Sequence, residues 1–139
     1  MNNYIESKVS VITTDATGKA KKSTVTYLCQ EESFARAEQL SLENSAAYGE
    51  ASVQKMQVVK YSEIIRSANV DADMLFYKFR VAFITLDEKS GKEKRTIVSI
   101  LVEGTDDKDA RKNFEQAMAI SVTDWQVVSI AESPINEIV

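Results

Sequence analysis

Seven basic residues around two turn-like segments are the most obvious candidates for a binding function in this sequence. Lysine and arginine contact phosphate groups, and exposed aromatic rings such as Tyr4, Tyr27 or Tyr77 stack on unpaired bases. The sequence therefore offers a single-stranded nucleic-acid site, although its net charge of −4 is unlike the basic domains of dedicated nucleic-acid binders. Lysines at hairpin tips are also commonly just solvated. The basic residues are Lys19, Lys21 and Lys22 at the first segment, and Lys89, Lys92, Lys94 and Arg95 at the second.

Catalytic and metal-binding residue types are scarce. The chain has no histidine, so the commonest general base and the usual partner of a nucleophilic serine or cysteine are missing. Cys29 is the only cysteine and falls within an alternating strand pattern, which predicts a small buried hydrophobic residue. The acidic pairs Glu31-Glu32 and Asp106-Asp107 could bind a hard cation, but they are more typical of solvated residues entering a helix. We therefore expect no enzyme activity, metal or cofactor.

The elements that position these residues come from an internal duplication. Val9 and Ile12 match Val81 and Ile84 at a constant offset of 72 (81 − 9), and Gly18-Lys19 matches Gly91-Lys92 at 73 (91 − 18). The matching order continues toward the end of the chain. The sequence is thus one unit written twice.

Each repeat reads as strand, turn, strand, helix and strand. Residues 77–83 alternate apolar and polar side chains, as a half-buried strand does. Residues 15–19 and 87–92 are rich in turn formers and predict hairpin connections. The return strands place Val25, Tyr27 and Cys29 on one face, matched by Val98, Ile100 and Val102.

Two helices complete the repeats. The first is expected at 33–48, with Ser33 as N-cap and with Phe34, Ala37 and Leu40 on one side. The second is expected at about 105–120, where Ala110, Phe114, Ala117 and Met118 have the spacing of a buried stripe. These patterns predict an α+β fold, a tandem β-β-α-β repeat with pseudo-twofold symmetry, mainly antiparallel sheet and two helices packed on it. The mixed pattern of the third strands leaves open whether the halves share one sheet.

Length and composition favour one domain over residues 1–139. Repeats of about 65 residues are marginal alone, so we expect residues 4–65 and 76–139 to share a core, with 66–75 as the connection. The chain has no apolar run long enough to span a membrane, and its first residues lack the regions of a signal peptide. The cytoplasm is the expected location.

Two short segments that follow the third strands repeat an apolar pattern around a glutamate. They are Tyr61-Ser62-Glu63-Ile64-Ile65 and Ile130-Ala131-Glu132-Ser133-Pro134-Ile135. They are candidate docking segments, but we favour the interpretation that they cover the core or pair the two halves.

The chain resembles a known family of short proteins. The resemblance rests on residues 81–91, with 61–64 before them and 131–135 after them, and extends to 27–29 and 33–38. That family is a domain of unknown function from Bacteroidetes chromosomes and their phages. Tyr4-Ile5 replaces the aromatic opening of the family. The resemblance implies a bacterial or phage cytoplasmic setting and brings no catalytic or binding residues.

These observations predict a non-enzymatic protein-binding or assembly module that has a protein partner or forms a homo-oligomer. The alternative is a single-stranded nucleic-acid-binding protein that uses the two basic hairpins. Salt distinguishes them, because phosphate contacts weaken steeply as salt rises and an apolar protein interface largely persists.

Overall fold

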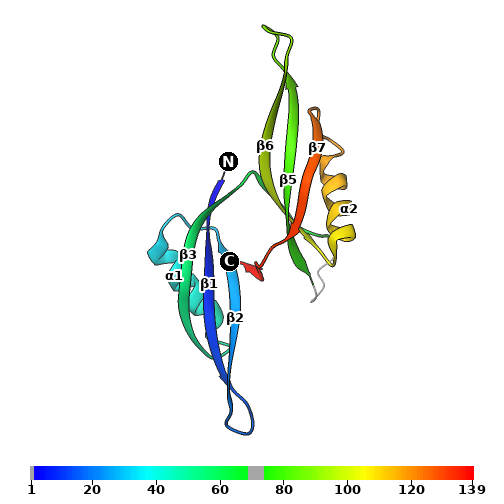
Figure 1. Cartoon of the computed structure of the whole chain (residues 1–139). Helices are drawn as coiled ribbons and strands as arrows, with labels where there is room; N and C mark the ends of the chain where they lie inside the picture. Colours follow the sequence, from blue (N-terminus) through cyan, green and yellow to red (C-terminus); the bar gives the residue numbers. More distant parts are fainter. Residues whose placement is uncertain (1, 69–73) are drawn as a thin grey trace. The chain divides into compact units, whose positions relative to one another are not determined.

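A computed structural model describes residues 2–68 and 74–139, which form eight strands and two helices (Figure 1). The connection expected at 66–75 includes residues 69–73, which lie outside the described residues. The α+β prediction is confirmed, and each repeat runs β-β-α-β before a short further strand. The elements are β1 (Asn2–Thr14), β2 (Ala20–Cys29), α1 (Phe34–Ser45), β3 (Glu50–Tyr61), β4 (Glu63–Ile65), β5 (Leu75–Leu86), β6 (Glu93–Gly104), α2 (Asp107–Met118), β7 (Asp124–Glu132) and β8 (Glu137–Ile138).

The chain divides into two compact units, each built on its own four-stranded sheet. The first unit comprises Asn3–Lys60 and Pro134–Val139, and the second contains Tyr61–Ser133. Strand order is β3-β1-β2-β8 in the first unit and β4-β6-β5-β7 in the second. The question that the sequence left open is thereby answered, because the two repeats form separate sheets.

The first unit is organised around the β1–β2 hairpin. Its antiparallel register runs from Ile5 opposite Cys29 to Thr14 opposite Ala20. The expected turn at 15–19 closes it, with the Asp15 amide donating to the Lys19 carbonyl at 3.0 Å. Gly18 has a φ of 80°, a conformation that glycine adopts without steric cost.

The second unit repeats this plan with longer pairing. β5 and β6 pair from Leu75 opposite Gly104 to Leu86 opposite Glu93. β7 adds to the other side of β5, also antiparallel, and its register shifts between Arg80 and Val81. Arg80 faces Ser129 whereas Val81 faces Val127, so Val128 is an extra residue on β7. This bulge explains why the alternation of β7 is mixed in the sequence.

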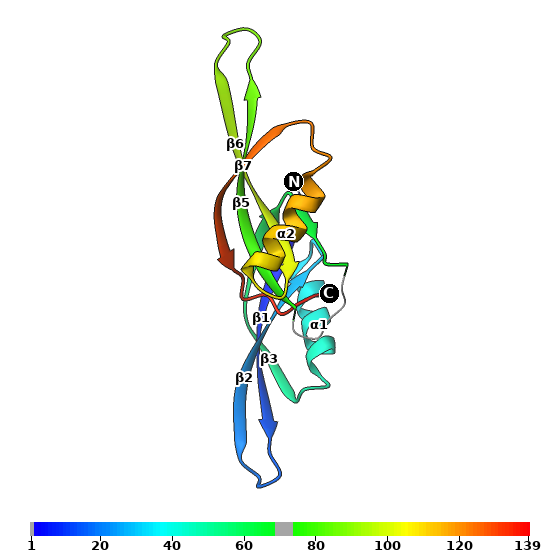
Figure 2. The same cartoon turned by 90° about the vertical axis from the view of Figure 1, so that its right-hand side faces the viewer.

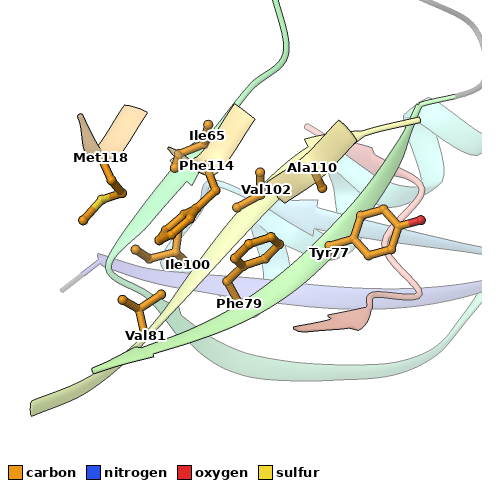
Figure 3. Packing of buried hydrophobic residues seen from close by; sticks show 9 residues of the cluster. All are labelled: Ile65, Tyr77, Phe79, Val81, Ile100, Val102, Ala110, Phe114 and Met118. Carbon is orange, nitrogen blue, oxygen red and sulfur yellow. The ribbon is translucent and has the colours of Figure 1, made fainter. Parts of the chain in front are cut away.

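Helix α2 covers one face of the second sheet and makes an apolar core with it (Figures 2 and 3). The predicted stripe is confirmed: Ala110, Phe114 and Met118 are buried. The Phe114 ring lies 4.9 Å from the Phe79 ring and 5.2 Å from the Trp125 ring, between centroids. Aromatic pairs at this distance stabilise a core beyond the area they bury.

Helix α1 buries a different face from the predicted one. Ser33 is the N-cap, as expected, and its Oγ accepts from the Arg36 amide. The buried residues, however, are Ala37, Ser41 and Ser45, while Phe34 remains 46% exposed. The prediction from apolar spacing is confirmed at Ala37 but wrong at Phe34. Two serines take the place of Phe34 in the core because their hydroxyls find partners inside the unit and can therefore be buried at little cost.

The two cores exchange large and small residues at matched positions. In the first unit a large ring comes from the second strand, and small residues come from the helix and the first strand. In the second unit the large groups come from the helix and the first strand. The matched pairs are Ser7 with Phe79, Tyr27 with Ile100, Ser41 with Phe114, and Ser45 with Met118.

Candidate functional site

The basic hairpins are exposed, and within each hairpin the consecutive basic side chains do not lie on one face. All seven predicted residues are exposed in the structure. Lys21 and Lys22 are consecutive on β2, and Lys94 and Arg95 are consecutive on β6, so the members of each pair point to opposite faces of their ribbon. Arg95 is also engaged, because its guanidinium donates to the Gln126 side-chain oxygen at 3.0 Å.

Acidic residues organise the tips of both hairpins. Asp15 Oδ1 accepts from the Thr17 hydroxyl at 2.6 Å and from the Lys19 amide at 2.8 Å. These bonds, the Thr17 side chain first, lower the pKa of the Asp15 carboxyl. At the second tip, Asp87 accepts from the Lys89 amide at 3.0 Å. A fixed carboxylate therefore lies beside the lysines of each hairpin.

Two of the three proposed stacking residues are not accessible. Tyr27 is 0% exposed and Tyr77 is 7% exposed. The prediction that they could stack on bases was wrong, because both rings lie on the core face of their strands. Tyr4 remains partly exposed.

The interior of the first unit holds a group of hydroxyls and a thiol. Ser45 donates to the Tyr27 hydroxyl at 3.0 Å, and Ser41 Oγ lies 2.8 Å from Ser7 Oγ. Cys29 is buried, as predicted, with its Sγ 3.7 Å from Ser41 Oγ. Burial is the main cause that raises the pKa of both the Tyr27 hydroxyl and the Cys29 thiol. These groups are thus kept protonated inside the core, and they organise packing.

The short strand β4 is a segment of the first repeat that docks on the sheet of the second. Residues 63–65 pair in parallel with 100–102 of β6. The Ser62 amide donates to the Ser99 carbonyl at 2.8 Å. Beyond β4, the Ser67 amide donates to the Glu103 carboxylate at 2.9 Å. The segment is therefore tied by its main chain on both sides of the strand.

Residues 134–139 are a segment of the second repeat that docks on the sheet of the first: they continue the second repeat but belong to the first unit. We call them the terminal segment; Figure 1 shows it beside β2. The Asn136 amide donates to the Thr26 carbonyl at 2.8 Å, and Asn136 Oδ1 accepts from the Thr26 amide at 2.8 Å. Further along, the Val139 amide donates to Leu28 and the Gln30 amide donates to the Val139 oxygen. Four hydrogen bonds thus fix its register.

The two docked segments are equivalent residue by residue. Glu63 pairs with Ile100 and Glu137 with Tyr27, and Ile100 and Tyr27 are matched positions of the repeat. The correspondence therefore aligns 61–65 with 135–139, at an offset of 74 (137 − 63). The sequence comparison, which aligned the first segment with 130–135, was displaced because residues 130–132 still belong to β7. As we favoured, the segments pair the two halves.

Each sheet is open, with edge strands β3 and β8 in the first and β4 and β7 in the second; β3 and β7 are the long edge strands, and in the described part of the chain no strand pairs with their outer side. A groove of about 480 Å³ lies along β3, between this edge strand and α1. Its lining is mixed: Leu42, Ala51, Val53 and Met56 are apolar, and Glu38, Ser52, Gln54 and Lys55 are polar or charged. An open edge beside a partly apolar groove is an arrangement that extended peptides occupy by strand addition.

A second groove, of about 450 Å³, lies on the sheet of the first unit and is polar. Lys8, Thr24 and Lys55 line it from the strands, and Pro134 and Asn136 line it from the terminal segment. Lys8 and Thr24 alternate with core residues on their strands, so this groove is on the face opposite α1. Glu6 also lines it, so the groove combines hydrogen-bonding groups with one carboxylate and two lysines.

No cluster of three or more histidine, cysteine or acidic residues that could hold a metal ion occurs in residues 2–68 and 74–139. Over the same residues, no helix is long and apolar enough to cross a membrane. The features of the structure that are best suited to binding are the open sheet edges and the two docked segments.

Comparison with known proteins gives a family without an assigned activity. No curated protein and no solved structure matches the chain. One family model, described as a domain of unknown function, matches residues 3–139 and so covers nearly the whole sequence. The chain therefore belongs to the DUF4494 family.

Proposed function

We propose that this protein is a non-enzymatic protein-binding or assembly module of bacterial or phage origin that acts in the cytoplasm. The observation that carries the proposal is the groove between α1 and the open edge of β3. Its ligand is an extended segment of a partner protein. The main chain of that segment pairs with β3, and its apolar side chains enter the groove.

Binding by strand addition is supported by the fact that each sheet already binds one short segment in this way. β2 and β6 each hold a short extended segment through main-chain hydrogen bonds and buried apolar side chains. Main-chain pairing supplies affinity, and pockets for alternate side chains supply specificity. The β3 edge offers the same two features to a segment from outside the chain.

The groove can be tested with a substitution that leaves the core in place. Leu42 is only partly buried, and it lines the groove one helical turn after Glu38. The change Leu42→Glu replaces an apolar side chain of the lining with a second carboxylate, and this added charge opposes docking of apolar side chains. We expect at least a tenfold loss of partner capture, with an unchanged circular dichroism spectrum.

The experiment is affinity purification of the tagged protein from its source cells, with and without nuclease. A partner that survives nuclease and high salt, and is lost with Leu42→Glu, supports the proposal. The matched control reverses the charges of Lys92, Lys94 and Arg95 and should retain the partner. Capture that requires nucleic acid and disappears with the charge reversal would overturn the proposal in favour of the hairpins.

A further inference from the structure

The terminal segment is bound by a unit other than the one that it continues. β7 ends at Glu132 in the second unit, and the segment from Pro134 onward makes its contacts in the first. Ile135 is 3% exposed, and Val139 packs against the first core. The four hydrogen bonds of the segment are therefore all made to the first unit.

The acceptor for this segment is the edge of β2 from Thr26 to Gln30. The Thr26 amide and carbonyl, the Leu28 carbonyl and the Gln30 amide all point to the segment and bond to it. These are main-chain groups, which make the same bonds with any segment that has the same sequence and direction. A second copy of the chain carries that segment.

We propose that the β2 edge accepts residues 134–139 from a second copy of this chain, so that two copies exchange their terminal segments reciprocally and form a closed dimer. Each acceptor then contains the same contacts as in the single chain. Exchange of an identical element costs little beyond association, because the bonds broken within each chain are remade between chains. Within one chain the segment is held at high effective concentration, so exchange is expected at high protein concentration.

This inference deepens the proposed assembly function but uses a different edge. The proposed partner occupies β3, whereas the exchanged segment occupies β2. The two ideas therefore fail separately: Leu42→Glu should abolish capture of the partner and leave segment exchange unchanged.

The test uses two full-length copies, each defective in one half of the exchange. The acceptor copy carries Ile135→Ala and Asn136→Ala, which weaken its own segment and leave its β2 edge intact. The donor copy carries Gln30→Pro, which removes the amide that donates to Val139 and leaves its segment intact. In the mixture, the intact segment of the donor copy can bind the intact β2 edge of the acceptor copy, and it then makes the full set of contacts that neither copy makes alone.

We expect the mixture to form a heterodimer of twice 15.5 kDa by light scattering, with an affinity at least tenfold tighter than the self-association of either copy. The matched control is a donor copy that also carries Ile135→Ala and Asn136→Ala, which should not pair. Absence of a heterodimer between two copies that are folded by circular dichroism would overturn the inference. Equal pairing of the control donor would do so as well.

A second measurement does not depend on folding of the Gln30→Pro copy. A fluorescent peptide of residues 133–139 should bind the full-length acceptor copy at least tenfold tighter than the wild-type chain, whose own segment occupies the edge. If the acceptor copy does not fold, Asn136→Ala alone serves in its place. Equal binding to both chains, or binding to neither, would refute acceptance of the segment from outside.

Discussion

Replacement of Asn136 by alanine should loosen the terminal segment without unfolding the sheet that holds it. Asn136 Oδ1 accepts from the Thr26 amide at 2.8 Å, and Thr26 is only 5% exposed. Asn136→Ala leaves this buried amide without its acceptor. An unsatisfied buried donor costs about 1–3 kcal/mol, which corresponds to a factor of about 5–150 in the equilibrium between docked and undocked segment.

The Gln30 amide reports on that equilibrium directly, because it donates to the Val139 oxygen at the far end of the segment. Hydrogen exchange followed by NMR should therefore show protection of the Gln30 amide falling by about 5–150-fold in Asn136→Ala. The amides that pair β1 with β2 should keep their protection, since the hairpin register runs through other groups.

The matched control is Asn136→Asp, which keeps an oxygen at the position of Oδ1 and should retain most of the protection at Gln30. Unchanged protection of Gln30 in Asn136→Ala would refute the reasoning, because the side-chain bond would then contribute nothing to docking. An equal loss in Asn136→Asp would also refute it, as would an equal loss across the β1–β2 hairpin.

Four further tests concern the first unit. Tyr27→Phe deprives the buried Ser45 hydroxyl of its acceptor and should lower the free energy of unfolding by about 1–3 kcal/mol in a urea titration, with little further loss when Ser45→Ala is added. The thiol of Cys29 should resist a thiol reagent until the chain unfolds. Burial raises the folded-state pKa of Cys29. The contribution of the thiol to stability is therefore complete below its unfolded-state pKa, about 8.5, and is lost as the pH rises through the folded-state pKa. Urea midpoints measured at increasing pH, and compared with those of Cys29→Ala, check this prediction. Gly49→Ala brings a Cβ within 2.4 Å of the Ile12 carbonyl oxygen at a φ of 147°, and a thermal melt should show a loss of at least about 1–3 kcal/mol.

Local patterns were sufficient to predict most of the fold. The turn formers at 15–19 and 87–92 placed both hairpins, and each begins with an aspartate that accepts from the amides of its own turn. Ser33 predicted the start of α1 because a serine at that position can accept from the first free amides of a helix. Such features act over a few residues, so they are visible in a sequence.

Features that depend on distant partners were not predictable. The buried face of α1 includes Ser41 and Ser45, whose burial is acceptable only because Ser7 and Tyr27 supply partners from the strands. Hydrophobic spacing cannot anticipate a hydroxyl partner 34 positions away. It selected Phe34 instead, which is exposed.

The sequence suggested that the two segments pair the halves, but it did not show which residues pair, and the reason is different. Each segment pairs over only two or three residues, too few for a periodic pattern. The apolar pattern around glutamate suggested that the segments matter, but the bulge that adds Val128 to β7 obscured where the second segment begins. Only the pairing of Glu63 and Glu137 with matched strand positions makes the equivalence visible.

Within one chain, each repeat binds the short segment that follows the other repeat. This docking explains how the two repeats can have different cores and still depend on each other. Large and small residues have changed places between strand and helix, so the apolar volume of each unit is filled in its own way. The edges of β2 and β6 that accept the segments are not affected by these differences, because they bind through main-chain groups that do not change with the side chains. A repeat can therefore repack its interior while it continues to accept the segment of the other. Two copies of the chain would meet through the same unaltered edges.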